Sequence, residues 1–186
     1  FDTNFYHLIK LAKGRFLIFF TDDDYAVPAN FHRFLDFLEN HQPHVCVTPY
    51  VDLATGKTER SFDRIIVNEK AKLIPENIFD FILLSGLTIR RDMLFEYDFS
   101  QIRNSIYSQV YVFIMACSEF GPSYYDEPII IKGEDGENGF SNTLEPLKSD
   151  RKNYLSNLSF HKGLIIVIKL ADSHLIANGR LLHKFT

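Results

Sequence analysis

The stretch that most constrains the fold is Arg15–Tyr25, RFLIFFTDDDY, in which an uninterrupted apolar run ends at three consecutive aspartates. The run Phe16–Phe20 is short, rich in aromatic residues and bounded by polar ones. This pattern is typical of a strand buried on both faces, as in the parallel sheet of an α/β domain. A buried strand needs no acid at its end, and three adjacent carboxylates repel one another unless a cation or hydrogen-bond donors compensate them. We therefore expect a ligand beyond this end of the strand, which is where open α/β sheets bind their ligands.

The aspartates fit a divalent cation that is shared with a diphosphate. Mg²⁺ and Mn²⁺ prefer oxygen ligands and take few of them from the protein when phosphate and water supply the rest. In an extended segment Asp22 and Asp24 would face one side while Asp23 turns away. The alternative is a solvated acidic turn, whose charge favours the N-terminus of the helix that follows it. The residues alone leave both interpretations open, and the strand context favours the metal.

The remaining elements alternate between helices and strands, as in an α/β fold. Helices are expected where apolar residues recur every three to four positions, and strands where short apolar runs lie between turn signals. The predicted helices cover 4–13, 28–40, 75–81, a short helix from 90, and 106–118; the predicted strands cover 16–20, 44–51, 83–89 and 129–131. The glycine-rich segment Gly133–Ser141 is predicted to be a flexible rim loop.

The two ends of the chain carry separate expectations. The chain begins at Phe1, within a helical pattern, and we expect it to be a fragment of a longer protein that supplies the first strand of a βαβ unit. From Ser149 onward a broken apolar stripe with interspersed lysines predicts a helical extension, so we divide the chain into 1–148 and 149–186. This stripe permits peripheral contact with a membrane, although packing on the domain or on a partner is favoured.

Composition excludes several classes of protein. A net charge of −4 over 186 residues argues against a nucleic-acid binder, which would show a basic face. The two cysteines, Cys46 and Cys117, are far apart and form no metal-binding motif, which is typical of reduced thiols in a cytoplasmic protein. No apolar run approaches the ~20 residues that span a bilayer.

With these elements in place, the segments AKGRFLIFFTDDDYAVPANF and LLSGLTIRRDML resemble glycosyltransferase family 2, which has the GT-A fold. The order of elements over about residues 4 to 140 is most similar to the branch of abequosyltransferases and other O-antigen or capsule sugar transferases. The resemblance implies a three-layer αβα sandwich related to the Rossmann fold, without its N-terminal nucleotide-base half.

The resemblance also implies a function and site residues. The function would be metal-dependent transfer of a sugar, of the hexosyltransferase type, from a nucleotide-diphospho-sugar to a glycan or lipid-linked acceptor in cell-surface polysaccharide synthesis. Such an enzyme would be cytoplasmic or peripheral at the inner face of the membrane. Asp24, with Asp22, would hold Mn²⁺ or Mg²⁺, and the substrates would contact Asp22, Asp23, Ser85 and Gly86.

One departure from the family pattern concerns the catalytic base. The family commonly has a Glu-Asp pair at the start of the helix that begins here near Tyr107, but this chain has Tyr107-Ser108-Gln109. Asp98 is the candidate substitute, because an inverting transferase needs a base to deprotonate the acceptor hydroxyl. The missing pair keeps open a non-catalytic GT-A-like module for binding or assembly. A phosphotransferase or nucleotidyltransferase is weaker, since no phosphate-binding glycine loop is present.

The basic pair Arg90-Arg91 has two interpretations as well. It could contact a phosphate or an anionic acceptor, or it could be solvated at the start of a surface helix.

Overall fold

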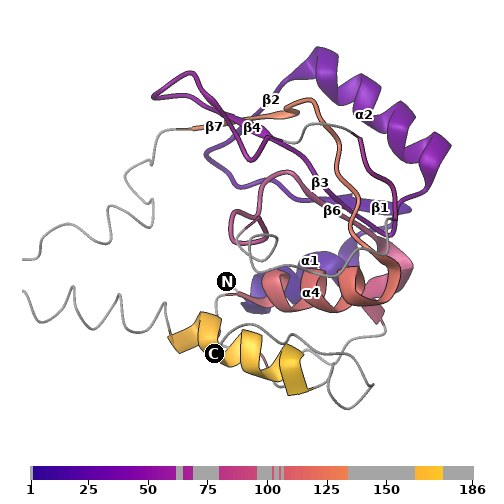
Figure 1. Cartoon of the computed structure of the whole chain (residues 1–186), viewed down its shortest axis with the longest axis vertical. Coiled ribbons are helices and arrows are strands. Elements are labelled where there is room, and N and C mark those ends of the chain that lie inside the picture. Colours follow the sequence, from indigo (N-terminus) through magenta and orange to yellow (C-terminus); the bar gives the residue numbers. More distant parts are fainter. Residues whose placement is uncertain are drawn as a thin grey trace, which may run out of the picture.

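A computed structural model describes residues 2–61, 65–68, 80–95, Ile102, Ser105, 107–133 and 162–173. These residues form three layers, with strands between helices on either side (Figure 1). The elements are α1 (Asp2–Leu11), β1 (Phe16–Ile18), β2 (Tyr25–Ala26), α2 (Pro28–His41), β3 (Val45–Val47), β4 (Tyr50–Asp52), β5 (Thr58–Glu59), β6 (Leu87–Arg90), the 3₁₀ helix η1 (Arg91–Phe95), α4 (Ser108–Phe120) and β7 (Ile130–Lys132). A further helix covers 162–173.

The described strands form two sheets. One has the order β1-β6-β3 and the other β2-β7-β4-β5. The expectation of a parallel partner for the first apolar strand is wrong: β1 pairs antiparallel with β6, so that Phe16 faces Arg90 and Ile18 faces Thr88. β6 also pairs antiparallel with β3, and it therefore separates two strands that run in the same direction. The parallel pair among the described strands is β4 with β7.

The strand β1 is covered on both faces, as predicted. Leu17 and Phe19 belong to the core on the side of α1 and α4, whereas Phe16, Ile18 and Phe20 pack into the core under α2. This alternation is the expected result of the two-residue side-chain period of a strand. The three-layer prediction is therefore confirmed, with α2 on one side of the strands and α1 with α4 on the other (Figure 1).

Several boundaries differ from the predicted ones. The segment 44–51 contains two strands, β3 and the start of β4, because Pro49 has no N–H to donate to a ladder. The strand predicted at 83–89 starts only at Leu87, since Gly86 has a φ of 80° and turns the chain. The short helix predicted from 90 is a 3₁₀ helix that covers 91–95. The helix predicted at 75–81 lies mostly outside the described residues.

The helix at 162–173 packs on the main core, as the favoured interpretation of the apolar stripe predicts for this part of it. Val167 and Ala171 are fully buried in the same cluster as α1 and α4. Ile165 and Ile166 remain 51% and 44% exposed. No helix among the described residues is long and apolar enough to cross a membrane. The rest of 149–186 lies outside the described part of the chain.

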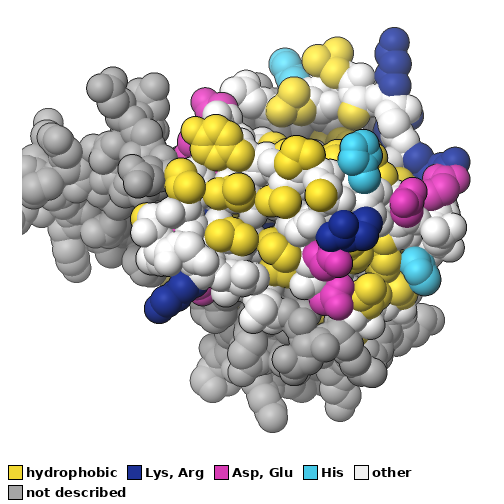
Figure 2. Space-filling view, turned by 90° about the horizontal axis from the view of Figure 1, so that it is seen from above, with side chains coloured by type: hydrophobic (Ala, Val, Ile, Leu, Met, Phe, Trp, Pro, Cys, Tyr) yellow, Lys and Arg dark blue, Asp and Glu magenta, His cyan; other side chains and the backbone are white. Residues whose placement is uncertain are grey.

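The side of the molecule that carries α2 exposes apolar side chains to solvent. Viewed from this side, hydrophobic side chains extend across the middle of the face (Figure 2). Most charged and histidine side chains lie to the right in this view, and a few charged ones lie at the left. Leu35 of α2 is 41% exposed and Tyr25 of β2 is 59% exposed. The inward side of α2 contributes Phe34, Phe37 and Leu38, which are buried.

Candidate functional site

The three aspartates lie in a tight turn beyond β1. The Asp24 N–H donates to the Thr21 carbonyl oxygen at 3.4 Å, which closes the turn. Asp22 is exposed, whereas Asp23 and Asp24 are half-buried. The prediction that Asp22 and Asp24 face one side assumed an extended segment. Because the segment is a turn, the alternation of an extended chain does not apply to it. All three carboxylates still lie within one short loop.

Asp24 anchors this turn to a distant strand. Its Oδ1 accepts the Gly133 N–H at 2.9 Å, directly after β7, and its Oδ2 accepts the Thr21 hydroxyl at 2.8 Å. A carboxylate oxygen has two lone pairs, so each oxygen retains a site for a further contact. The carboxylate is thus held in one orientation and can still bind a cation.

Ser85 connects the aspartate turn to the loop that precedes β6. Its Oγ accepts the Thr21 N–H at 2.9 Å and lies 3.1 Å from the Thr21 Oγ1. Because the Thr21 hydroxyl donates its proton to Asp24, Ser85 is the donor in the second contact. Ser85 is fully buried, so Ser85, Thr21 and Asp24 form a fixed chain of hydrogen bonds that ends at the carboxylate.

Gly86 fits this loop because it has no side chain. Its N–H donates to the Phe19 carbonyl oxygen at 3.1 Å, and its own carbonyl oxygen accepts the Thr48 N–H at 3.2 Å. A Cβ at this position would collide with the Thr48 hydroxyl and the Arg60 guanidinium, and the φ of 80° also disfavours other residues. The structure therefore brings the predicted pair Ser85-Gly86 against the aspartate turn, with a packing role for Gly86.

Gly133 and Thr21 are site residues that sequence reasoning missed. A Cβ on Gly133 would collide with the Asp23 carbonyl oxygen, so a glycine is needed where β7 ends beside the turn. The available signal was the position of Gly133, a glycine two residues beyond the end of a predicted strand. Sequence reasoning assigned it to a flexible loop, and the rest of that loop lies outside the described residues.

Arg60 is a cation behind the site that no motif indicated. Its guanidinium donates to four main-chain carbonyl oxygens, at 2.8 Å for Thr48, 2.8 Å for Asp80, 3.3 Å for Leu83 and 2.7 Å for Ser85. Burial lowers its pKa to about 10, against the opposing influence of nearby acidic groups, Asp80 first and Asp24 among them. Arg60 therefore stays charged at neutral pH and gives the rear of the site a positive field.

The donor set fits a metal that is only partly coordinated by protein. No group of three or more His, Cys, Asp or Glu side chains among the described residues could enclose a metal ion. Asp22 and Asp23 have no hydrogen-bond or ion-pair partner within the described part of the chain. Two carboxylates of one turn suit Mg²⁺ or Mn²⁺ when a diphosphate and water supply the other ligands.

None of the described residues at the start of α4 carries a carboxylate. Ser108 and Gln109 are buried there, and the Gln109 Nε2 donates to the Ile82 carbonyl oxygen at 3.3 Å. Asp98, the predicted base, lies outside the described residues. The identity of a base therefore stays a prediction.

Comparison with known proteins identifies the fold. No protein-family model matches the sequence, and no curated protein gives a significant match. The structure of S. aureus TarS 1–349 in complex with UDP is similar with a TM-score of 0.51 at 14% sequence identity, over 84% of this chain and 48% of that chain. A second structure of S. aureus TarS 1–349 has a TM-score of 0.45 at 15% identity, over 96% of this chain and 52% of that chain. This chain thus spans about half the length of the TarS chain, 48% in the first comparison, and it has a GT-A-like fold.

Proposed function

We propose that this chain belongs to a metal-dependent glycosyltransferase that moves a sugar from a nucleotide-diphospho-sugar to a glycan or lipid-linked acceptor. The proposal rests on one observation: the aspartate turn, Ser85 and Gly133 form a hydrogen-bonded unit at the end of β1 in a GT-A-like fold. An acidic turn that served only to begin α2 would not need bonds to β7 and to the loop before β6. Cell-surface polysaccharide synthesis by an abequosyltransferase-like enzyme is the finer form of the proposal.

Each group of the site has a role in this proposal. Asp22 and Asp24 would hold Mn²⁺ or Mg²⁺, and Asp23 would lie along the donor sugar. Ser85 and Gly86, which are buried beneath the turn, would hold the turn in place under the substrate. The bound cation would neutralise charge on the leaving diphosphate. Arg60 would add a fixed positive field that requires no rearrangement during the reaction. UDP is the first nucleotide to test, since one similar structure contains it.

A second candidate function is a module that binds the nucleotide without transfer. The start of α4 favours it, because Ser108 and Gln109 occupy the position where the resembling family has acids, and both are buried. Without a base, a transferase could not deprotonate an acceptor hydroxyl. Nucleotide binding is common to both candidates, whereas incorporation of sugar into an acceptor occurs only in the first.

Location is the least constrained part of the proposal. The exposed Ile165 and Ile166 give the helix at 162–173 a small apolar surface that would suit peripheral contact with the inner face of a membrane. A cytoplasmic enzyme that acts on lipid-linked acceptors would use such contact.

The test is a thermal-shift comparison of the wild type with Asp24→Asn, using UDP, GDP, CDP and dTDP with and without Mn²⁺ or Mg²⁺. An asparagine keeps the local hydrogen bonds, because its Oδ1 can accept the Gly133 N–H and its Nδ2 can donate to Thr21. The variant therefore removes charge without removing the anchor. Asp36→Asn, an exposed aspartate on α2, is the matched control for loss of one negative charge.

We expect one nucleotide to raise the melting temperature of the wild type and of Asp36→Asn only with the metal, and not that of Asp24→Asn. A ligand at about 100 times its Kd stabilises the native state by about 2.7 kcal/mol, which is readily measured. Equal stabilisation of Asp24→Asn would refute the metal role of that residue. Incorporation of labelled sugar into an acceptor would then separate the transferase from the binding module.

A further inference from the structure

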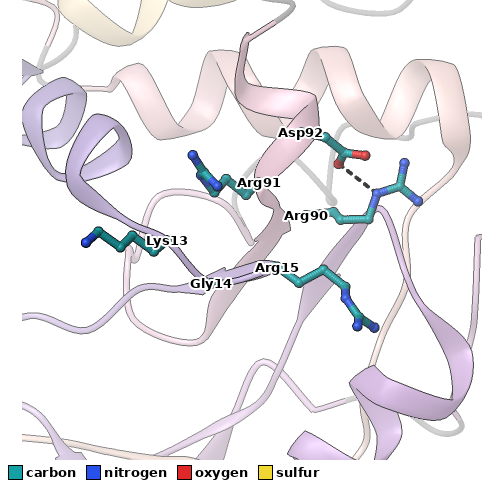
Figure 3. Close-up of a pocket in the computed structure, with 6 residues that line it drawn as sticks. All are labelled: Lys13, Gly14, Arg15, Arg90, Arg91 and Asp92. Carbon is teal, nitrogen blue, oxygen red and sulfur yellow. Dashed lines mark hydrogen bonds and ion pairs between the residues drawn. The ribbon is translucent and has the colours of Figure 1, made fainter.

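A hollow lies where β1 begins and β6 ends, on the far side of these strands from the aspartate turn. Its volume is about 450 Å³, within the range of about 300–1,000 Å³ that is usual for small-molecule sites. The aspartates follow β1, whereas the hollow precedes it. The lining residues are Lys13, Gly14, Arg15, Arg90, Arg91 and Asp92 (Figure 3).

The antiparallel pairing of β1 with β6 assembles this hollow from two distant segments. Phe16 faces Arg90 across the pair, and the Arg91 N–H donates to the Arg15 carbonyl oxygen at 2.8 Å. Gly14 contributes only backbone to the lining, so no side chain fills the space between Lys13 and Arg15. In Figure 3 Lys13 and Arg91 extend to one side of the strand pair, and Arg15 and Arg90 to the other.

The charge of the lining is strongly unbalanced. Four of its six residues are cationic and one is acidic, in a chain whose net charge is −4. The Asp92 Oδ1 accepts the Arg90 Nε–H at 2.7 Å and offsets one of these charges. Arg15 pairs at 3.1 Å with Glu39, which lies outside the lining, through side chains that are 56% and 69% exposed. An exposed pair of this kind contributes little, about 0 to 1 kcal/mol.

Local structure explains only part of this clustering of cationic residues. Lys13 follows the C-terminus of α1, where the carbonyl dipoles favour a cation. That argument does not extend to the three arginines. Arg90 pairs with Asp92 and Arg15 with Glu39, so the four cations of the lining still exceed these two carboxylates, and like charges repel one another. Lys13 has no ion pair among the described residues.

We propose that this pocket binds the phosphate group of a small phosphorylated ligand, through Lys13 and Arg91, with Arg15 and Arg90 adding to its positive field. Guanidinium groups match phosphate oxygens in pairs, and ammonium groups bind phosphate as point charges. Lys13 is exposed and can reach an incoming ligand, whereas the half-buried Arg91 provides a more fixed donor. The site is separate from the aspartate turn, and the proposal does not depend on the proposed function.

The test is calorimetric titration of the full chain with sodium pyrophosphate, at fixed ionic strength and without divalent cations. The pocket variant is Lys13→Gln/Arg91→Gln. A second pocket variant, Lys13→Gln/Arg15→Gln, changes only exposed residues and preserves the fold if the loss of Arg91 does not. The matched control Lys10→Gln/Lys57→Gln removes the same charge from exposed positions outside the pocket. Parallel sedimentation with vesicles of phosphatidic acid in phosphatidylcholine distinguishes a lipid headgroup from a free phosphate.

We expect saturable binding of pyrophosphate that is weakened at least about tenfold in the pocket variants and less than about twofold in the control. Asp24→Asn should bind pyrophosphate as the wild type does, so failure of the metal site would not affect the result. Binding only to phosphatidic acid vesicles, lost in the pocket variants, would also support the site and would identify a lipid as the source of the phosphate. Absence of both kinds of binding, or equal loss in the control, would overturn the proposal.

Discussion

Arg60 joins segments of the chain that meet behind the aspartate turn. It donates to the carbonyl oxygen of Thr48 after β3 and to those of Asp80, Leu83 and Ser85 in the loop before β6. Among the described residues Arg60 supplies the hydrogen bonds to these carbonyl groups, three of which belong to a loop that forms no strand. The position of Ser85, and through it that of Thr21 and Asp24, therefore depends on a side chain outside every recognisable motif.

We expect Arg60→Lys to lower the free energy of unfolding by about 2–4 kcal/mol. An ammonium group cannot reproduce a planar fork of donors, and each buried acceptor left unpaired costs about 1–3 kcal/mol. Urea denaturation would measure the change. Arg33→Lys, in an exposed pair with Glu127, is the control and should stay within about 0.5 kcal/mol of the wild type. A small effect of Arg60→Lys, similar to that of the control, would contradict this role.

At the scale of elements, local patterns predicted what lies within one segment. The helices α1, α2 and α4 begin and end within two residues of their predicted bounds, because each has an apolar stripe and a local stop such as Gly14 or Pro43. The burial of β1 on both faces was predictable for the same reason. Pairing was not, since the direction of β6 depends on which strands flank it, and no local pattern specifies that.

The site shows the same division between local and tertiary information. The aspartate turn and the Ser85-Gly86 segment were recognisable as sequence motifs. Their connection through Thr21, the contact with Gly133 and the clamp by Arg60 are tertiary contacts between segments far apart in the chain. A single sequence does not contain that information in any short window.

The helix at 162–173 gives a prediction at the scale of elements. Its Gly163 lies against the backbone of Ser105, and a Cβ there would collide with the Ser105 carbonyl oxygen. We expect Gly163→Ala to displace the helix and to destabilise the fold by about 1–3 kcal/mol, despite the better helix propensity of alanine. Lys169→Ala, at an exposed position of the same helix, is the control. Thermal unfolding that is unchanged or raised in Gly163→Ala would show that this helix does not pack as described.

At the scale of the whole molecule, the strands separate two regions of opposite charge. The aspartate turn lies beyond the C-terminal end of β1, and the cationic lining of the hollow lies at its N-terminal end. This polarity comes from the antiparallel pairing of β1 with β6, which was not predicted. Arg90 and Arg91 were singled out in the sequence, but only the pairing brings them to Lys13 and Arg15 and away from the aspartates.

The stability of the whole molecule should depend on pH through Asp80. Burial raises the pKa of this carboxyl from 3.8 to about 6, although the neighbouring Arg60 opposes the shift. The folded protein therefore binds this proton more tightly than the unfolded chain does. The neutral form of Asp80 therefore adds to the free energy of unfolding. This contribution has its full value below about pH 4 and is lost as the pH rises through about 6.

Asp80→Asn keeps the shape of the neutral carboxyl at every pH and tests this dependence. Because Asp80 is only half-buried, solvent screens its charge. We therefore expect the pKa shift to change the free energy of unfolding by only about 1 kcal/mol. We expect the variant to be more stable than the wild type by this amount near pH 7.5 and equal to it near pH 4, as measured by urea denaturation at both values. Asp36→Asn, on the exposed face of α2, is the control for the loss of one negative charge. A loss of stability in Asp80→Asn near pH 7.5 would mean that the attraction between Asp80 and Arg60 exceeds the cost of burying the charge. A gain that is the same at both pH values would mean that folding does not change proton binding at Asp80.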